Sequence, residues 1–151
     1  VHEAPGHAPH HAVYHDPDAD VVFAADAAGI YVPEIDAVTP TSPPPQFDFE
    51  QCLDDIRLIE ELDPDTLCFG HFGPRDCDAD LLGEAKRAYV EWVERVREKR
   101  AELDDDEAVV DHFEAASRDI DYWNRERAKA NTSLNARGVL TYLDRVDDEE
   151  E

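Results

Sequence analysis

Three residues in the first half of the chain pair metal-binding side chains with positions at the ends of apolar segments. His7 follows a Pro-Gly turn in a histidine-rich stretch, Asp26 follows the apolar run Val21–Ala25, and His71 comes just after the run Thr66–Phe69. Imidazole and carboxylate groups are ligands that zinc accepts. The three positions therefore predict a metal site assembled from strand ends.

Plainer interpretations of the same residues remain open. Asp26 can cap a turn, because small residues follow it. The histidines near the start of the chain can be a surface cluster without a ligand role; they are His2, His7, His10, His11 and His15. The three cysteines, Cys52, Cys68 and Cys77, fit no CxxC spacing, so we expect them to be reduced and partly buried.

The residues around these positions predict short strands followed by helices. Residues 1–32 have β character, and the prolines of residues 33–47 predict an extended connection. Asp48 is expected to cap a helix that ends before Pro64, and a short buried strand follows. The apolar spacing predicts three further helices: one through about residue 103, one carrying Val109, Val110, Phe113, Ile120 and Trp123, and one near Leu134 to Val146.

Three strings of this sequence together resemble motifs of the metallo-β-lactamase fold superfamily. APGHAPHH (residues 4–11) is similar to that family's PGH loop, VVFAADAAG (21–29) to its strand ending in a bridging aspartate, and CFGHFGP (68–74) to its final histidine loop. The closing segment NARGVLTYL (135–143) is similar to the helical extension of one branch of these hydrolases.

The resemblance implies a role for each matched residue. His7 would bind a first metal ion, Asp26 would bridge two ions as the catalytic carboxylate, and His71 would bind the second. The cofactor would be zinc, two ions per complete site, although iron and manganese accept the same ligands. Three further residues are expected to contact the ligands or the substrate: His10, His11 and Tyr31.

The family's HxHxDH motif is missing from these 151 residues, and the chain contains no methionine. We therefore expect that motif to precede Val1. The predicted fold class is α/β: residues 1–75 are the C-terminal half of an αββα metallo-β-lactamase sandwich. Residues 76–146 are a helical extension packed on it, and 147–151 form an acidic tail.

The resemblance implies a metal-dependent hydrolase that uses metal-activated water on an ester, thioester, amide or phosphoester of a small molecule. Without the upstream motif each metal position keeps too few ligands, since catalytic zinc usually has three from the protein. The alternative is a catalytically incompetent remnant or interaction module, which pairs with a second copy or with a missing N-terminal half. An acidic protein whose histidines bind no metal is a further alternative.

The charge of the chain restricts its partners and setting. Its formal net charge is −24 and its pI about 4.3, so nucleic acid and anionic membranes would be repelled. No apolar run is long enough to span a membrane, and a cytoplasmic location is expected. Concentrated salt screens self-repulsion of this size, so the acidity predicts a salt-rich, halophilic cytoplasm. An ordinary acidic protein is the alternative.

Overall fold

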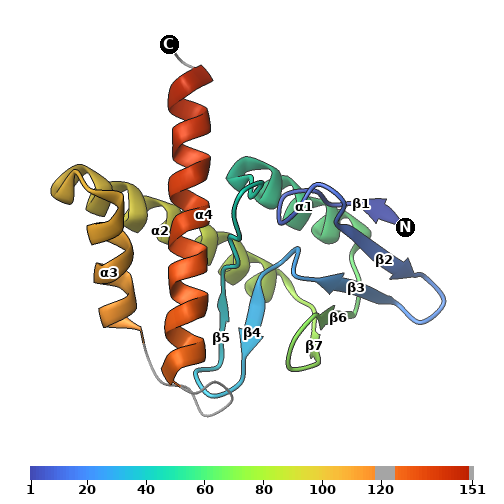
Figure 1. Ribbon diagram of the computed structural model, residues 1–151. Helices are drawn as coiled ribbons and strands as arrows, with labels where there is room; N and C mark the ends of the chain where they lie inside the picture. The colour runs from blue at the N-terminus through green and yellow to red at the C-terminus, as the bar shows by residue number, and fades with distance from the viewer. Residues whose placement is uncertain (118–124, 150–151) are drawn as a thin grey trace.

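The computed structural model describes residues 1–117 and 125–149, in which strands and helices form a mixed α/β fold (Figure 1). The strands are β1 (His2–Glu3), β2 (Ala12–Asp16), β3 (Val21–Ala25), β4 (Ile30–Val32), β5 (Ala37–Thr39), β6 (Thr66–Phe69) and β7 (Pro74–Asp76). The helices are α1 (Phe49–Leu62), α2 (Ala79–Leu103), α3 (Asp106–Ala116) and α4 (Arg125–Glu149). None of the helices in these residues is both long and apolar enough to cross a membrane.

The main sheet has five strands in the order β1-β2-β3-β6-β7. Its only parallel pair, among the described strands, is β3 with β6, and α1 belongs to the crossover that joins them. The other neighbours pair antiparallel. Because parallel strands run in the same direction, the chain leaves β3 and β6 at the same edge of the sheet. This edge carries the segments that contain Asp26 and His71.

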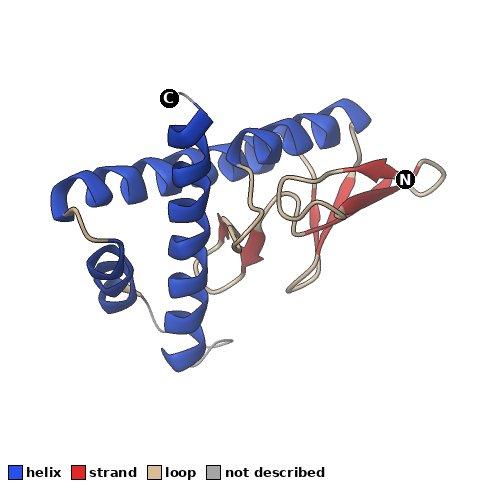
Figure 2. Cartoon of the chain, turned by 45° about the horizontal axis from the view of Figure 1, so that its top comes forward, coloured by secondary structure: helices blue, strands red, loops and turns tan. Residues whose placement is uncertain are grey.

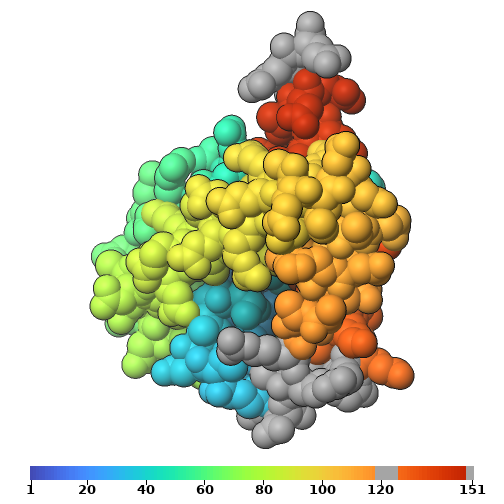
Figure 3. Space-filling view, turned by 90° about the vertical axis from the view of Figure 1, so that its left-hand side faces the viewer, coloured from blue at the N-terminus to red at the C-terminus, as the bar shows by residue number. Residues whose placement is uncertain are grey.

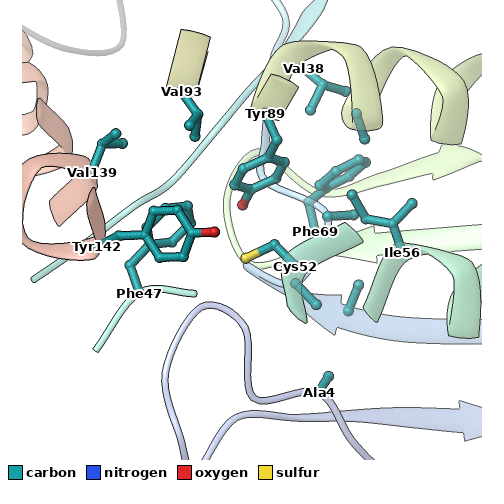
Figure 4. Packing of buried hydrophobic residues seen from close by; sticks show 14 of the residues in the cluster. Ala4, Val38, Phe47, Cys52, Ile56, Phe69, Tyr89, Val93, Val139 and Tyr142 are labelled. Atoms are coloured by element: carbon teal, nitrogen blue, oxygen red, sulfur yellow. The ribbon is translucent and has the colours of Figure 1, made fainter. Parts of the chain in front are cut away.

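Residues on the two faces of this sheet alternate between buried and exposed. Val22 of β3 and Leu67 of β6 are fully buried, and they join a core that includes Cys52 and Ile56 of α1 (Figure 4). On the opposite face, Tyr14 and Phe23 pair across β2 and β3 and are 57% and 51% exposed. The helices therefore cover one face of the sheet, and two aromatic side chains lie exposed on the other.

Helix α1 confirms the boundaries expected from its sequence. The carboxylate of Asp48 accepts a hydrogen bond from the Gln51 amide at 3.0 Å, as in an N-cap, and the helix ends where Asp63 turns left-handed. Helix α2 likewise ends at Leu103, as its apolar spacing predicts.

Two elements differ from the sequence expectation. The proline-rich segment contains β5, which pairs with β4 in a separate two-stranded sheet, because Tyr31 and Val38 bury apolar area on opposite strands. Helix α4 begins at Arg125 rather than near Leu134 and continues to Glu149, into the segment expected to be a tail. Its first part, residues 125–133, is mostly polar but contains arginine, lysine and alanine, which favour helix without a strong apolar stripe. Ile120 and Trp123 lie outside the described residues.

The long helices form the other end of the molecule (Figure 2). Helices α3 and α4 pack against each other, and α2 contacts both of them. Figure 3 shows α2 and α3 as one continuous surface, beyond which the last turns of α4 project. These helices also contact the proline-rich segment: Ser42 bonds Asn135 of α4 twice, backbone N–H to Oδ1 and Oγ to backbone oxygen, both at 2.8 Å.

Candidate metal centre

Asp26 and His71 meet at the edge where β3 and β6 end. Ala25 adopts a left-handed conformation (φ 47°) that turns the chain after β3, and its carbonyl accepts a hydrogen bond from the Gly70 amide at 2.8 Å. This turn and this hydrogen bond bring residues 26 and 71 alongside each other. His71 Nε2 lies 3.8 Å from Asp26 Oδ1.

His7 reaches the same carboxylate from the loop between β1 and β2. Its Nε2 lies 3.6 Å from Asp26 Oδ2, while its Nδ1 lies 2.8 Å from Thr41 Oγ1. The two histidines therefore face different oxygens of one carboxylate. Each oxygen of the Asp26 carboxylate therefore has one histidine ring beside it.

Helix α1 fixes the loop that carries His7 by holding both sides of Gly6. The Gly6 amide donates to the buried carboxylate of Asp55 at 2.7 Å, and the Gly6 carbonyl accepts from the Asp48 amide at 2.9 Å. A Cβ atom at position 6 would lie 2.4 Å from the Cys52 amide nitrogen, so only glycine lets the loop approach the helix this closely. The Pro-Gly turn is thus a docking point on α1.

The carboxylate of Asp26 has the features of a cation ligand. Both histidine distances are too long for hydrogen bonds. Two ligands about 2.0–2.2 Å from one tetrahedral zinc ion lie roughly 3.3–3.6 Å apart, close to the observed separations. Asp26 Oδ1 is buried, and within residues 1–117 and 125–149 it has no hydrogen-bond partner. A buried oxygen without a donor is costly to a metal-free fold, and a metal ion would satisfy it.

The number of ligands limits how firmly these residues hold an ion. Among the described residues, no group of three or more histidine, cysteine or acidic side chains converges as a metal site. Each of the two positions has one histidine and a share of Asp26. His7, Asp26 and His71 therefore fit one edge of a binuclear site, and they complete neither position by themselves.

The electrostatic surroundings keep His7 in the form that binds metal ions. Burial lowers the pKa of the His7 imidazole, and the nearby Asp26 carboxylate opposes that shift only in part. His11 and His10 lower the pKa of His7 further. The His7 ring is therefore neutral at neutral pH, with one ring nitrogen free to act as a ligand.

The three residues that were expected to contact the ligands or the substrate lie in different surroundings. His11 lies beside the site: its ring packs edge-on against His7 with centroids 5.5 Å apart, and its Nε2 lies 3.4 Å from the Asp26 amide. His10 is exposed on the loop. Tyr31 is buried against Phe69, and its other described contacts are a hydrogen bond to Asp36 and a stacked Arg75, so none of these reaches a candidate ligand.

Thr41 and Asp55 are the residues of this site that the sequence did not indicate. Asp55 could have been recognised in the sequence, because it is a charged residue on the buried stripe of α1 beside Ile56. Thr41 could not have been recognised in this way, since it lies in a proline-rich segment and contacts His7, which is 34 positions away in the chain.

The three cysteines are free thiols, and none of them contacts the Asp26 carboxylate in the described hydrogen bonds and ion pairs. Cys52 is buried, and Cys68 and Cys77 are partly buried, all as free thiols. Burial raises the pKa of the Cys52 thiol far above its usual range, and burial together with Asp78 raises the pKa of Cys77 to about 11. The thiols of Cys52 and Cys77 therefore stay protonated at neutral pH and are poor ligands.

Comparisons with known proteins give one family match and one similar solved structure. Residues 1–71 match the family model of the metallo-beta-lactamase superfamily. A solved structure of a metallo-beta-lactamase family protein from Thermus thermophilus is similar to the whole chain, with a TM-score of 0.59 and 20% identity over 95% of this chain. The chain spans 43% of the length of that protein. The search of curated proteins found no match. The family model thus covers just under half of the chain, and the structural similarity shows that the chain has the fold of a metallo-beta-lactamase family protein.

Proposed function

We propose that this chain carries part of the active site of a metal-dependent hydrolase acting on small molecules. His7 and His71 would each hold one metal ion, and Asp26 would bridge them. The observation that carries this proposal is the Asp26 carboxylate, whose two oxygens face different histidines and one of which is buried without a partner among the described residues. The match of residues 1–71 to the metallo-beta-lactamase superfamily supports a metallo-hydrolase-like function.

The residues have distinct roles in the proposed reaction. Zinc ions, when bound, would lower the pKa of water and polarise an ester, thioester, amide or phosphoester bond. Asp26 would hold the two positions together, and the neutral His7 would offer Nε2 while Thr41 engages Nδ1. His71, half exposed at the sheet edge, would leave its position open to substrate.

A zinc measurement on the chain as given tests this proposal. In a titration of this chain with Zn²⁺ we expect weak binding of up to two ions, because each position has only one histidine and a share of Asp26. His7→Ala should bind less, because one position loses its histidine. His10→Ala is the matched control, since His10 is exposed on the same loop. A chain that binds no Zn²⁺ in the titration, or whose Zn²⁺ binding is unchanged in His7→Ala, would contradict the proposal.

An association module is the second candidate, and the exposed sheet face favours it. Tyr14 and Phe23 form an adjacent aromatic pair with more than half of each side chain exposed. In this alternative the chain pairs through that face with a second copy or with a separate N-terminal half. Light scattering on the wild type and on Phe23→Ser separates the cases: a dimer that dissociates on substitution supports self-association, and a monomer in both excludes it.

A further inference from the structure

We propose that Thr41 is a positioning residue that sets the ring orientation and tautomer of His7, and that α2 holds Thr41 in place through Tyr89. This inference rests on the proposed metal-binding role of His7. It assigns a function at the site to helices that supply no ligand.

The first step is the proton on the His7 ring. A neutral imidazole carries one N–H, and a nitrogen that binds metal must be free of it. His7 Nε2 faces the Asp26 carboxylate at 3.6 Å, so the metal-binding tautomer has its proton on Nδ1. Thr41 Oγ1 lies 2.8 Å from Nδ1 and is placed to accept that proton's hydrogen bond.

The second step is what keeps the Thr41 hydroxyl an acceptor. Thr41 is 5% exposed, and Tyr89 is fully buried beside it among the core residues of α1 and α2 (Figure 4). The Thr41 amide donates to the Tyr89 hydroxyl at 3.3 Å, and that hydroxyl donates to the Thr41 carbonyl at 3.2 Å. The Thr41 hydroxyl can then donate its own proton to Tyr89 Oη, 3.4 Å away, while it accepts from His7. Each hydroxyl proton is used once.

The third step is the anchoring of the next residue. Ser42 is fully buried, its Oγ donates to the Asn135 backbone oxygen, and Trp92 Nε1 donates to that Oγ at 3.0 Å. Helices α2 and α4 therefore fix the backbone directly after Thr41. Tyr89 Oη already lies within hydrogen-bond distance of Thr41 Oγ1. The contact of Thr41 with His7 is therefore additional to what its own hydroxyl requires.

Three variants test the proposal. Thr41→Val keeps the shape and removes the acceptor, and Thr41→Ser keeps the hydroxyl. Thr39→Val is the matched control, because the described hydrogen bond of that hydroxyl, 3.3 Å long, is to the Ile30 carbonyl. The readout is the ¹⁵N chemical shifts of the His7 ring in the metal-free chain at about pH 8, where the ring is neutral, together with the affinity for Zn²⁺ by calorimetry.

We expect Nδ1-protonated His7 in the wild type, Thr41→Ser and Thr39→Val, and mainly Nε2-protonated His7 in Thr41→Val. Zinc affinity should fall roughly 10- to 100-fold in Thr41→Val and stay within about threefold in the other two. An unchanged tautomer in Thr41→Val overturns the proposal. If Thr41→Val does not fold, the wild type decides, because an Nε2-protonated His7 there overturns it as well. A wild type that binds no zinc contradicts the proposed function, while the ring shifts still test Thr41.

Discussion

At the scale of residues, the candidate site depends on a few buried polar contacts. Asp26 faces two histidines, and His7 is held on one side by Thr41 and on the other by the loop at Gly6. A second layer of hydrogen bonds supports this loop. The Asp55 carboxylate accepts a hydrogen bond from the Gly6 amide, and it accepts another from Gln51 Nε2 at 2.9 Å. The orientation of His7 is therefore restricted from two sides.

Replacing Asp55 tests this support. Asp55→Ala leaves the buried Gly6 N–H without its acceptor, and we expect a loss of about 1–3 kcal/mol in the free energy of unfolding. Asp54→Ala is the control on the same helix, where an exposed pair with Arg57 contributes at most about 1 kcal/mol. Urea denaturation measures both. Equal effects of the two substitutions would contradict the role given to Asp55.

At the scale of elements, the parallel pair β3–β6 creates the site and the helices stabilise it. The crossover through α1 puts Asp26 and His71 at one edge, and α1 holds the His7 loop against that edge. Helix α4 contacts the proline-rich segment at Gly138, where an added Cβ would lie 1.6 Å from the Ser42 carbonyl oxygen. Close backbone contact at this point anchors the segment that carries Thr41.

Substitution of Gly138 measures that contact. We expect Gly138→Ala to destabilise the fold by roughly 2–3 kcal/mol or more, because the Ser42 backbone must move. Gly83→Ala on α2 is the matched control: its Cβ meets nothing closer than 3.5 Å, and alanine favours helix by about 0.5–1 kcal/mol over glycine. Thermal melting gives the comparison. A Gly138→Ala protein as stable as the wild type would exclude the close contact.

The sequence was sufficient for the elements with strong local signals. The Asp48 cap and the apolar stripe of α1 fix that helix, and the positions of Asp26 and His71 after apolar runs predicted that both follow strands. Residues with only long-range partners were not predictable. Thr41 acquires its role from Tyr89, 48 positions away, and β5 forms only because β4 pairs with it. The start of α4 was missed because residues 125–133 are mostly polar and show no marked apolar period.

At the scale of the whole molecule, negative charge dominates the surface. The chain has 38 acidic and 14 basic residues. Some of the basic residues form ion pairs between helices. Arg100 of α2 contacts Asp106 at 3.0 Å and Asp144 of α4 at 2.5 Å. Arg137 of α4 forms a bidentate ion pair with Glu107 of α3. Salt weakens such exposed pairs slightly, but it weakens the excess repulsion far more.

Melting in salt tests the expected halophilic, cytoplasmic setting. We expect the melting temperature to rise steadily between about 0.1 M and 2 M KCl, because the Debye length falls from about 10 Å to about 3 Å or less. Sucrose at matched water activity is the control for solvent exclusion. A melting temperature that stays constant or falls with KCl would contradict salt adaptation.

The central claim is that the Asp26 carboxylate contributes to two metal positions, one with His7 and one with His71. The stoichiometry of Zn²⁺ binding tests this claim most directly. Calorimetric titration should give two weak binding events per wild-type chain, since neither position has its full set of ligands, and one each for His7→Ala and His71→Ala, which remove one histidine from either side of Asp26. Asp26→Asn should abolish both binding events, whereas Asp18→Asn, on an exposed turn, should leave them unchanged. Two ions bound with wild-type affinity by Asp26→Asn would contradict the claim.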